Sequence, residues 1–160
     1  MTGCWGHFKT ILKHKWYVFI ECCKMGIPLR GLTHDLSKFS PAEFIPSARY
    51  FQGNRSPIEA ERETVGYSRA WLNHKSKNKH HWQYWLDNGG TDKNGAVKWT
   101  PVPMPDKYIK EMYCDMVGAA KAYGGVTSAK GYYLSKRSGW LVHPETKDKF
   151  ERMLGLSDSR

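Results

Sequence analysis

The stretch "GLTHDLSKF" at residues 31–39 places a histidine and an aspartate side by side, with a lysine three positions further on, among small and apolar residues. Two interpretations of His34 and Asp35 are open. They are either a pair of metal ligands or a surface polar pair near a helix end. The choice depends on whether other ligand-type residues of the chain converge on this doublet.

Length and composition predict one folded domain, residues 1–160, with a basic surface. A chain of 160 residues buries roughly two-thirds of the surface that its unfolded form exposes, enough for a core with a site in it. The 25 Lys and Arg residues outnumber the 15 Asp and Glu residues, which leaves a net charge of +10. A polyanionic ligand such as a nucleic acid, a nucleotide or a phosphoester fits this charge. A basic surface without a dedicated partner is the simpler alternative.

The four cysteines, Cys4, Cys22, Cys23 and Cys114, show no CxxC spacing typical of zinc or redox sites. We expect free thiols in a reducing compartment. The N-terminus lacks the apolar core of a secretory signal, and no run approaches the roughly 18 apolar residues of a membrane span. These features predict a soluble, cytoplasmic protein without a membrane partner.

Apolar residues recur at steps of three and four along most of the chain, which predicts an all-α fold, and no segment shows a convincing strand alternation. Ser40 with Pro41 and Glu43 suits a helix start with a capping box. A long loop over residues 88–105 is the main interruption. The predicted helices cover residues 5–25, 40–51, 56–75, a short one within 80–90, 106–123, and two C-terminal helices within 127–154.

Several ligand-type residues fall on helix faces that should be buried. His14 lies between Ile11 and Val18, and Asp115 lies in "EMYCDMVGAA" with few charges nearby. A buried carboxylate is costly unless it is paired or bound to a cation. Each residue also has a structural interpretation, His14 as an ordinary core histidine and Asp115 as a hydrogen-bonded helix-packing residue.

Taken together, the order His14, His34-Asp35, Asp115 resembles the HD superfamily of metal-dependent phosphohydrolases. Those all-α enzymes use a His, a His-Asp doublet and a final Asp as metal ligands. The resemblance implies a single compact HD-like helical domain. "HDLSK" also resembles the HDxxK form, in which the lysine, here Lys38, contacts substrate phosphate. Without the resemblance Lys38 is equally well a solvated lysine before a helix cap.

The blocks "HDLSKF", "NKHHWQYW" and "EMYCD" resemble those of an uncharacterised family of small proteins from phages and gut bacteria. That likeness carries no established activity, but it suggests that the three blocks form one site. If the chain is phage-encoded, its location is the host cytoplasm, and degradation of a host signalling nucleotide as counter-defence becomes an attractive hypothesis.

Further histidines lie between the doublet and the last aspartate. Some HD enzymes hold two metal ions. The resemblance to them implies a second ion bound by His74 with His80 or His81, with Asp35 bridging the two ions. Because His80 and His81 are adjacent, we expect one of them to point elsewhere. "KHHW" is alternatively a basic, aromatic nucleic-acid contact.

The resulting hypothesis is a metal-dependent phosphohydrolase that acts on a nucleotide or a cyclic or linear oligonucleotide. Mixed His and carboxylate ligands suit Mn, Fe, Co, Ni or Zn, as one or two ions. The rivals are a non-catalytic basic nucleic-acid-binding protein with an HD-like fold and a module that inhibits a host protein. The candidate metal ligands are His14, His34, Asp35, His74, His80, His81 and Asp115. The catalytic candidates are Asp35, Lys38 and Glu111. Glu111 could orient a ligand histidine, and Glu43 could support a ligand in the same way or only cap its helix. The substrate candidates are Arg30, Lys38, Arg49, Lys77, Asn78, Lys79 and Tyr84.

Overall fold

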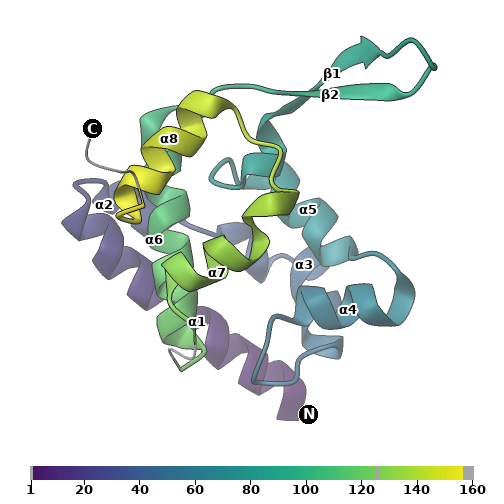
Figure 1. Ribbon diagram of the computed structural model, residues 1–160. Helices are drawn as coiled ribbons and strands as arrows, with labels where there is room; N and C mark the ends of the chain where they lie inside the picture. The colour runs from purple at the N-terminus through teal and green to yellow at the C-terminus, as the bar shows by residue number, and fades with distance from the viewer. Residues whose placement is uncertain (1, 125–126, 157–160) are drawn as a thin grey trace.

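Two long helices pack against each other at the centre of the computed structural model, α1 (Thr2–Lys24) and α6 (Asp106–Ala122) (Figure 1). Their contact is closest at Gly118, where a Cβ atom would lie 2.5 Å from Val18 Cγ2 and 3.0 Å from Val18 N. Val18, Cys22 and Cys114 are fully buried beside this contact. A glycine on α6 therefore lets the two backbones approach, and this approach brings their polar residues within reach of one another.

The structure describes residues 2–124 and 127–156. Within them no helix combines the length and the apolar character needed to cross a bilayer. The four cysteines are free thiols, as expected. The remaining elements in chain order are α2 (Pro28–Thr33), the 3-10 turn η1 (Leu36–Phe39), α3 (Pro41–Arg49), α4 (Pro57–Val65), α5 (Arg69–Lys77), η2 (Trp82–Trp85), β1 (Leu86–Thr91), β2 (Val97–Pro101), α7 (Ala129–Lys136), η3 (Arg137–Gly139) and α8 (Pro144–Met153).

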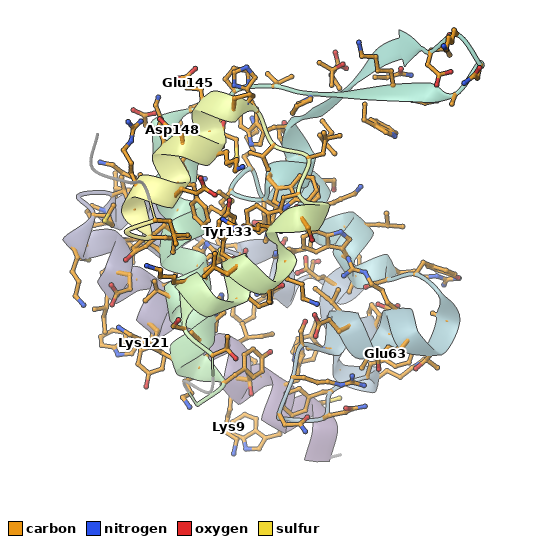
Figure 2. The ribbon with its side chains drawn as sticks, viewed as in Figure 1. Lys9, Glu63, Lys121, Tyr133, Glu145 and Asp148 are labelled. Atoms are coloured by element: carbon orange, nitrogen blue, oxygen red, sulfur yellow. The ribbon has the colours of Figure 1, made fainter. Side chains whose placement is uncertain are left out.

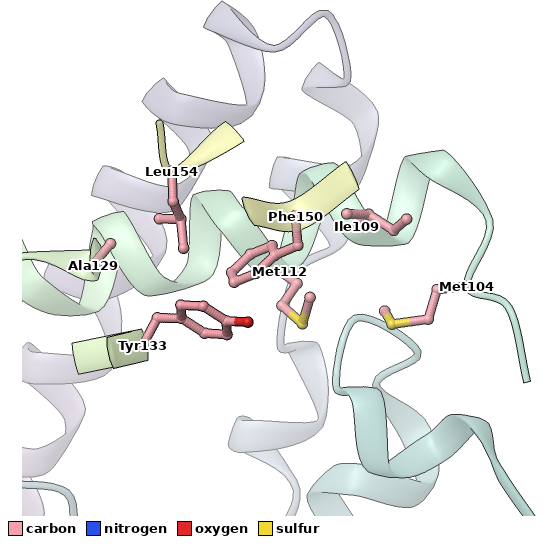
Figure 3. Packing of buried hydrophobic residues seen from close by; sticks show 7 residues of the cluster. All are labelled: Met104, Ile109, Met112, Ala129, Tyr133, Phe150 and Leu154. Atoms are coloured by element: carbon pink, nitrogen blue, oxygen red, sulfur yellow. The ribbon is translucent and has the colours of Figure 1, made fainter. Parts of the chain in front are cut away.

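The main hydrophobic core lies between α6 and the two C-terminal helices, α7 and α8 (Figure 3). Tyr133 of α7 packs edge-on against Phe150 of α8, with ring centroids 5.3 Å apart. Both contact α6 through Met112. The Tyr133 hydroxyl donates to Glu151 at 2.8 Å, so the buried ring keeps a partner for its polar end. This layer covers one side of α6 and leaves its other side to α1.

The helices α2, α3 and α5 complete the body. α2 packs on α1, and α3 packs on both α1 and α5. The turn between α2 and η1, which carries the His-Asp doublet, is therefore enclosed by α1 and α6 on one side and by η1, α3 and α5 on the other. The mostly helical fold and the two C-terminal helices agree with the sequence prediction.

The expected loop over residues 88–105 is wrong in part, because β1 and β2 form an antiparallel hairpin there. Asp92 Oδ1 accepts hydrogen bonds from the backbone amides of the reversal, and Gly95 adopts a left-handed φ of +81°. All residues from 87 to 100 are exposed, and Figure 2 shows the hairpin side chains standing apart from the body. The hairpin escaped prediction because neither of its faces is buried, so its strands lack the usual alternation.

Two predicted helices are also shorter than expected. The single helix over residues 56–75 is divided into α4 and α5, because Gly66 ends α4 with a φ of +82°. Ser68 then begins α5, its side chain accepting a hydrogen bond from Trp71 N. The short helix expected within residues 80–90 is reduced to the single turn η2 before the chain enters β1.

Replacing Gly118 with alanine tests the close packing of α1 on α6. The added methyl group would collide with Val18, and overpacking of this kind lowers the free energy of unfolding by about 1–3 kcal/mol. The gain in helix propensity, about 1 kcal/mol, offsets only part of that loss. Gly131→Ala in α7 is the matched control, because its Cβ would meet only the flexible side chains of Thr127 and Ser128, at 3.3 Å and 3.4 Å. Urea unfolding of both variants provides the measurement, and equal stability of the two would contradict this account.

Candidate metal centre

A break between α2 and η1 turns both residues of the His-Asp doublet inward. His34 is extended (φ −55°, ψ 129°) and Asp35 is left-handed (φ 54°, ψ 29°). Among the described residues, Asp35 is the only non-glycine residue with a positive φ. In a continuous helix two successive side chains would diverge, whereas here both are at most 1% exposed. Lys15 of α1 supports the turn by donating to the carbonyl oxygens of Leu32 and His34.

One group of ligand atoms forms around Asp35 Oδ2. His34 Nε2 lies 3.2 Å from this oxygen and 3.3 Å from Asp115 Oδ1. His14 Nε2 lies 3.1 Å from the same Asp115 oxygen and 3.6 Å from Asp35 Oδ2. All four residues offer atoms within 4.8 Å of one another. The group thus joins α1, the doublet turn and α6, in the order that the sequence comparison implied.

A second group forms around the other oxygen of the same carboxylate. His74 Nε2 lies 3.4 Å from Asp35 Oδ1, and His80 Nε2 lies 3.5 Å from it. His81 belongs to this group as well, with its ring 4.1 Å from that of His80. The expectation that one of the two adjacent histidines points elsewhere is therefore wrong. They follow α5 in an irregular turn rather than a helix, so successive side chains can face the same side.

The donor chemistry of these two groups fits divalent transition ions. Asp35 Oδ1, His80 Nε2 and His81 Nε2 are buried without a hydrogen-bond partner within the described part of the chain. Such orphaned atoms are rare because each costs free energy unless something binds it. Imidazole nitrogens mixed with carboxylate oxygens are ligands that Mn, Fe, Co, Ni and Zn share. Asp35 and the six other residues named as candidate ligands all lie in these two groups.

The carboxylate of Glu43 lies directly behind His74. Its Oε1 accepts from His74 Nδ1 at 2.6 Å, and its Oε2 accepts from Ser37 at 2.7 Å and from Asn73 at 3.2 Å. The expected capping box is therefore absent, and Ser40 instead donates its hydroxyl to the carbonyl oxygen of Ser37. Of the two roles that the sequence left open for Glu43, support of a ligand and capping of the helix, the structure shows the contact with a candidate ligand.

The electrostatics differ between the two groups. Burial opposes a charge on His34, but the carboxylates of Asp35, Asp115 and Glu111 outweigh burial and raise the pKa of His34 well above its usual value. The same neighbours act in reverse on Asp35, where burial is outweighed by His34, Lys38 and His74, so that its pKa falls well below the usual range. In contrast, burial and neighbouring histidines lower the pKa of His81. Without an ion, a proton on His34 supplies part of the positive charge that the carboxylates require.

Lys38 lies at the edge of the cluster, with Nζ 2.6 Å from Asp35 Oδ2 and a side chain 24% exposed. Burial disfavours its charge, but the Asp35 and Asp115 carboxylates raise the pKa of Lys38, so it stays protonated. The side chain of Asp115 is 17% exposed, far more than those of His34 and Asp35. The cluster is therefore most open to solvent at Asp115 and Lys38.

The other residues named as substrate contacts lie outside the two groups. Arg30 donates both Nε and Nη2 to Glu111, at 2.8 Å and 2.6 Å, so its guanidinium serves the interior rather than the open edge. Asn78 is buried and donates to the carbonyl oxygen of His74 at 2.8 Å. The remaining four are exposed at the ends of α3 and α5 and around η2: Arg49, Lys77, Lys79 and Tyr84.

Comparison with known proteins identifies one family. A family model described as a family of unknown function, DUF5662, matches residues 3–156. The chain belongs to the DUF5662 family. The match spans every candidate ligand from His14 to Asp115, and it agrees with the expected likeness to a family without an established activity. Neither the curated proteins nor the solved structures yield a significant match.

The charge pairing predicts how the stability of the ion-free protein depends on pH. The pKa of His34 is raised in the fold. Its full contribution to the free energy of unfolding is therefore present below the ordinary pKa of 6.5 and is lost as pH rises through the raised pKa. The pKa values of Asp35 and Asp115 are lowered, so their contributions are present above 3.8 and lost as pH falls. The melting temperature of chelator-treated protein should therefore be highest between about pH 3.8 and 6.5.

Thermal melts followed by circular dichroism across pH 3–9, with chelator and with added Mn²⁺, provide the measurement. Added ions should reduce the loss of stability at alkaline pH, because they replace the proton that His34 releases. A melting temperature of the chelated protein that climbs from pH 6.5 to 9 would contradict the charge assignment.

Proposed function

We propose that the chain is a metal-dependent phosphohydrolase of the HD type, with two divalent transition ions that share Asp35. The observation that carries the proposal is the position of this carboxylate. Its Oδ2 faces His14 and His34, whereas its Oδ1 faces His74 and His80. A buried aspartate with imidazole nitrogens on both sides is the arrangement that a bridging ligand needs.

A purely structural role for the cluster is less favourable. Four of the imidazoles have their Nε2 atoms turned toward Asp35 or Asp115. Asp35 Oδ1, His80 Nε2 and His81 Nε2 have no hydrogen-bond partner among the described residues. A hydrogen-bonded core network would be expected to leave few such atoms unsatisfied. Apolar residues in place of such a cluster would usually cost nothing or stabilise the fold, so a binding role accounts for the cluster better than a stabilising one.

The likeness to HD enzymes supports the same conclusion. The ligand order His, His-Asp, Asp falls on α1, the α2–η1 turn and α6 of a mostly helical domain. The additional histidines lie between the doublet and Asp115 in sequence, His74 within α5 and His80 and His81 after it, as the likeness to two-metal HD enzymes implies. The histidine-rich ligand set favours Mn, Fe, Co, Ni or Zn over Mg.

The residues of the site would have two roles in phosphoester hydrolysis, binding the ions and binding the phosphoryl group. Bound divalent ions lower the pKa of a coordinated water and polarise a phosphate oxygen. Asp35 and Asp115 would hold the ions and keep their charge fixed at the open edge of the cluster. Lys38, which stays protonated there, would neutralise negative charge on the phosphoryl group as the bond to the leaving oxygen breaks.

The proposed substrate is a nucleotide or a cyclic or linear oligonucleotide. The net charge of +10 favours a polyanion. Lys77 and Lys79 are exposed beside the second histidine group, and Lys79 Nζ lies 5.4 Å from the centre of the Tyr84 ring. These groups offer cations and an aromatic face near the site. A host signalling nucleotide, as a target of phage counter-defence, is the most specific form of the proposal.

Replacing Asp35 with asparagine tests the proposal. The variant keeps the shape of the side chain but loses the charge shared by both groups. Hydrolysis of bis-p-nitrophenyl phosphate and of a nucleotide panel by Mn²⁺-loaded protein should fall by more than about 100-fold, because even residues behind metal ligands often contribute about 10–100-fold. Asp148→Asn is the control, since this aspartate lies on the exposed face of α8 (Figure 2) and pairs there with Arg152.

Unchanged hydrolysis in Asp35→Asn would refute the site assignment. If the wild-type protein binds no ion and hydrolyses nothing, but binds DNA or RNA with strong dependence on salt, the nucleic-acid-binding alternative takes precedence.

Lys38→Gln separates substrate binding from ion binding. The variant removes the positive charge next to Asp35 without removing a ligand atom. We expect two ions to remain bound while kcat/KM falls by about 100–1,000-fold, the usual effect of losing one preorganised electrostatic partner of the transition state. Elemental analysis and steady-state kinetics of the same preparation provide the measurement. Loss of the ions together with activity would instead make Lys38 a residue that stabilises the ligand cluster.

A further inference from the structure

Glu111 of α6 contacts one histidine from each of the two ligand groups. Its Oε1 lies 3.1 Å from His34 Nδ1 and 3.4 Å from His80 Nδ1. His34 belongs to the group around Asp35 Oδ2, and His80 belongs to the group around Asp35 Oδ1. The two rings lie against each other, with centroids 4.5 Å apart. A single carboxylate oxygen therefore supports both groups from the side opposite Asp35.

The second oxygen of Glu111 is held by Arg30. The guanidinium donates through Nε at 2.8 Å and through Nη2 at 2.6 Å to Oε2. Arg30 itself packs over the ring of Tyr108, 4.6 Å from its centre. Glu111 is 1% exposed, so it has little freedom to choose other partners. The arginine leaves Oε1 directed at the two histidines.

This arrangement determines which ring nitrogens are available to an ion. A carboxylate accepts hydrogen bonds only, so His34 donates its Nδ1 proton to Glu111, and His80 Nδ1 faces the same oxygen at 3.4 Å. Their Nε2 atoms then present lone pairs toward Asp35 and Asp115. A third ion among His34, His80 and Glu111 is disfavoured, because Arg30 already supplies the positive charge that Glu111 requires and His34 Nδ1 carries a proton.

Glu43 provides a contrast within the same site. It supports His74 alone among the candidate ligands, and its other contacts are Ser37 and Asn73. Glu43 and Glu111 are thus two buried carboxylates of similar position behind the ligands. One serves a single ligand of one group, and the other serves a ligand of each.

We propose that Glu111, anchored by Arg30, is a positioning residue that couples the two ion sites. Because one ligand histidine of each site lies against the same carboxylate, an ion that fixes the histidine of one site restrains the histidine of the other through Glu111. The inference rests on the two-ion site proposed above and adds to it a specific dependence of each site on the other.

Metal titration of chelator-treated protein tests the coupling. Wild type, Glu111→Gln and Glu43→Gln are each titrated with Co²⁺ by visible absorption and with Mn²⁺ by calorimetry. We expect wild type to bind two ions with positive cooperativity. Glu111→Gln should lower the affinity for both ions, each by about 10–100-fold, and abolish the cooperativity. Glu43→Gln should lower the affinity for one ion only.

Arg30→Met provides a second variant that leaves every ligand and Glu111 in place. It should lower the affinity for both ions, as Glu111→Gln does. The coupling can therefore still be measured if Glu111→Gln fails to fold. Circular dichroism of the ion-free proteins checks folding.

The outcomes separate the two proposals. A wild-type protein that binds no pair of ions defeats the proposed function itself. A wild-type protein that binds two ions, together with Glu111→Gln and Arg30→Met variants that weaken only one or neither, overturns the coupling and leaves the proposed function intact.

Discussion

The structure depends on one buried charge, the carboxylate of Asp35. A carboxylate at 1% exposure is tolerated only where positive charge or strong donors surround it. Here four imidazoles and the ammonium group of Lys38 face its two oxygens. His34 and Lys38 are close to Asp35 in sequence, whereas the other three imidazoles come from α1 and from α5 and the turn after it, so distant segments meet at this carboxylate. The left-handed backbone at Asp35 is a local strain that this convergence compensates.

The supporting elements divide into layers with different tasks. The close packing at Gly118 joins α1 and α6 and so brings His14 to Asp115, while the apolar core under α7 and α8 holds α6 from the other side. Glu111 and Glu43 then orient the imidazoles from behind. A preformed cluster of this kind suits catalysis, because its charges need little rearrangement when a phosphoester arrives. The projecting hairpin takes no part in the cluster.

Much of this could be predicted from the sequence. Helix periodicity and the Pro and Gly boundaries gave the helical fold. The ligand order singled out His14, His34, Asp35 and Asp115, and the likeness to two-metal enzymes added His74 with one of His80 and His81, whereas the structure brings both of these together with it. The hairpin was missed because its exposed faces leave no alternation to detect. The role of Arg30 was missed for another reason: it was assigned to substrate, and its partner Glu111 is 81 residues away. For Glu43 the sequence could not choose between supporting a ligand and capping a helix, because its partner His74 is 31 residues away. Long-range pairing of this kind leaves no mark in local sequence.

Anomalous diffraction from crystals of the Mn²⁺-loaded protein tests the central claim most directly, because it locates ions without reference to any substrate. The account predicts two anomalous peaks in each chain, one beside each oxygen of Asp35, with His14, His34 and Asp115 around the first and His74, His80 and His81 around the second. A single peak on one side of Asp35 would reduce the site to one ion. The absence of any peak at the cluster, in crystals grown with excess Mn²⁺, would contradict the account and make Asp35 and its histidines a structural network.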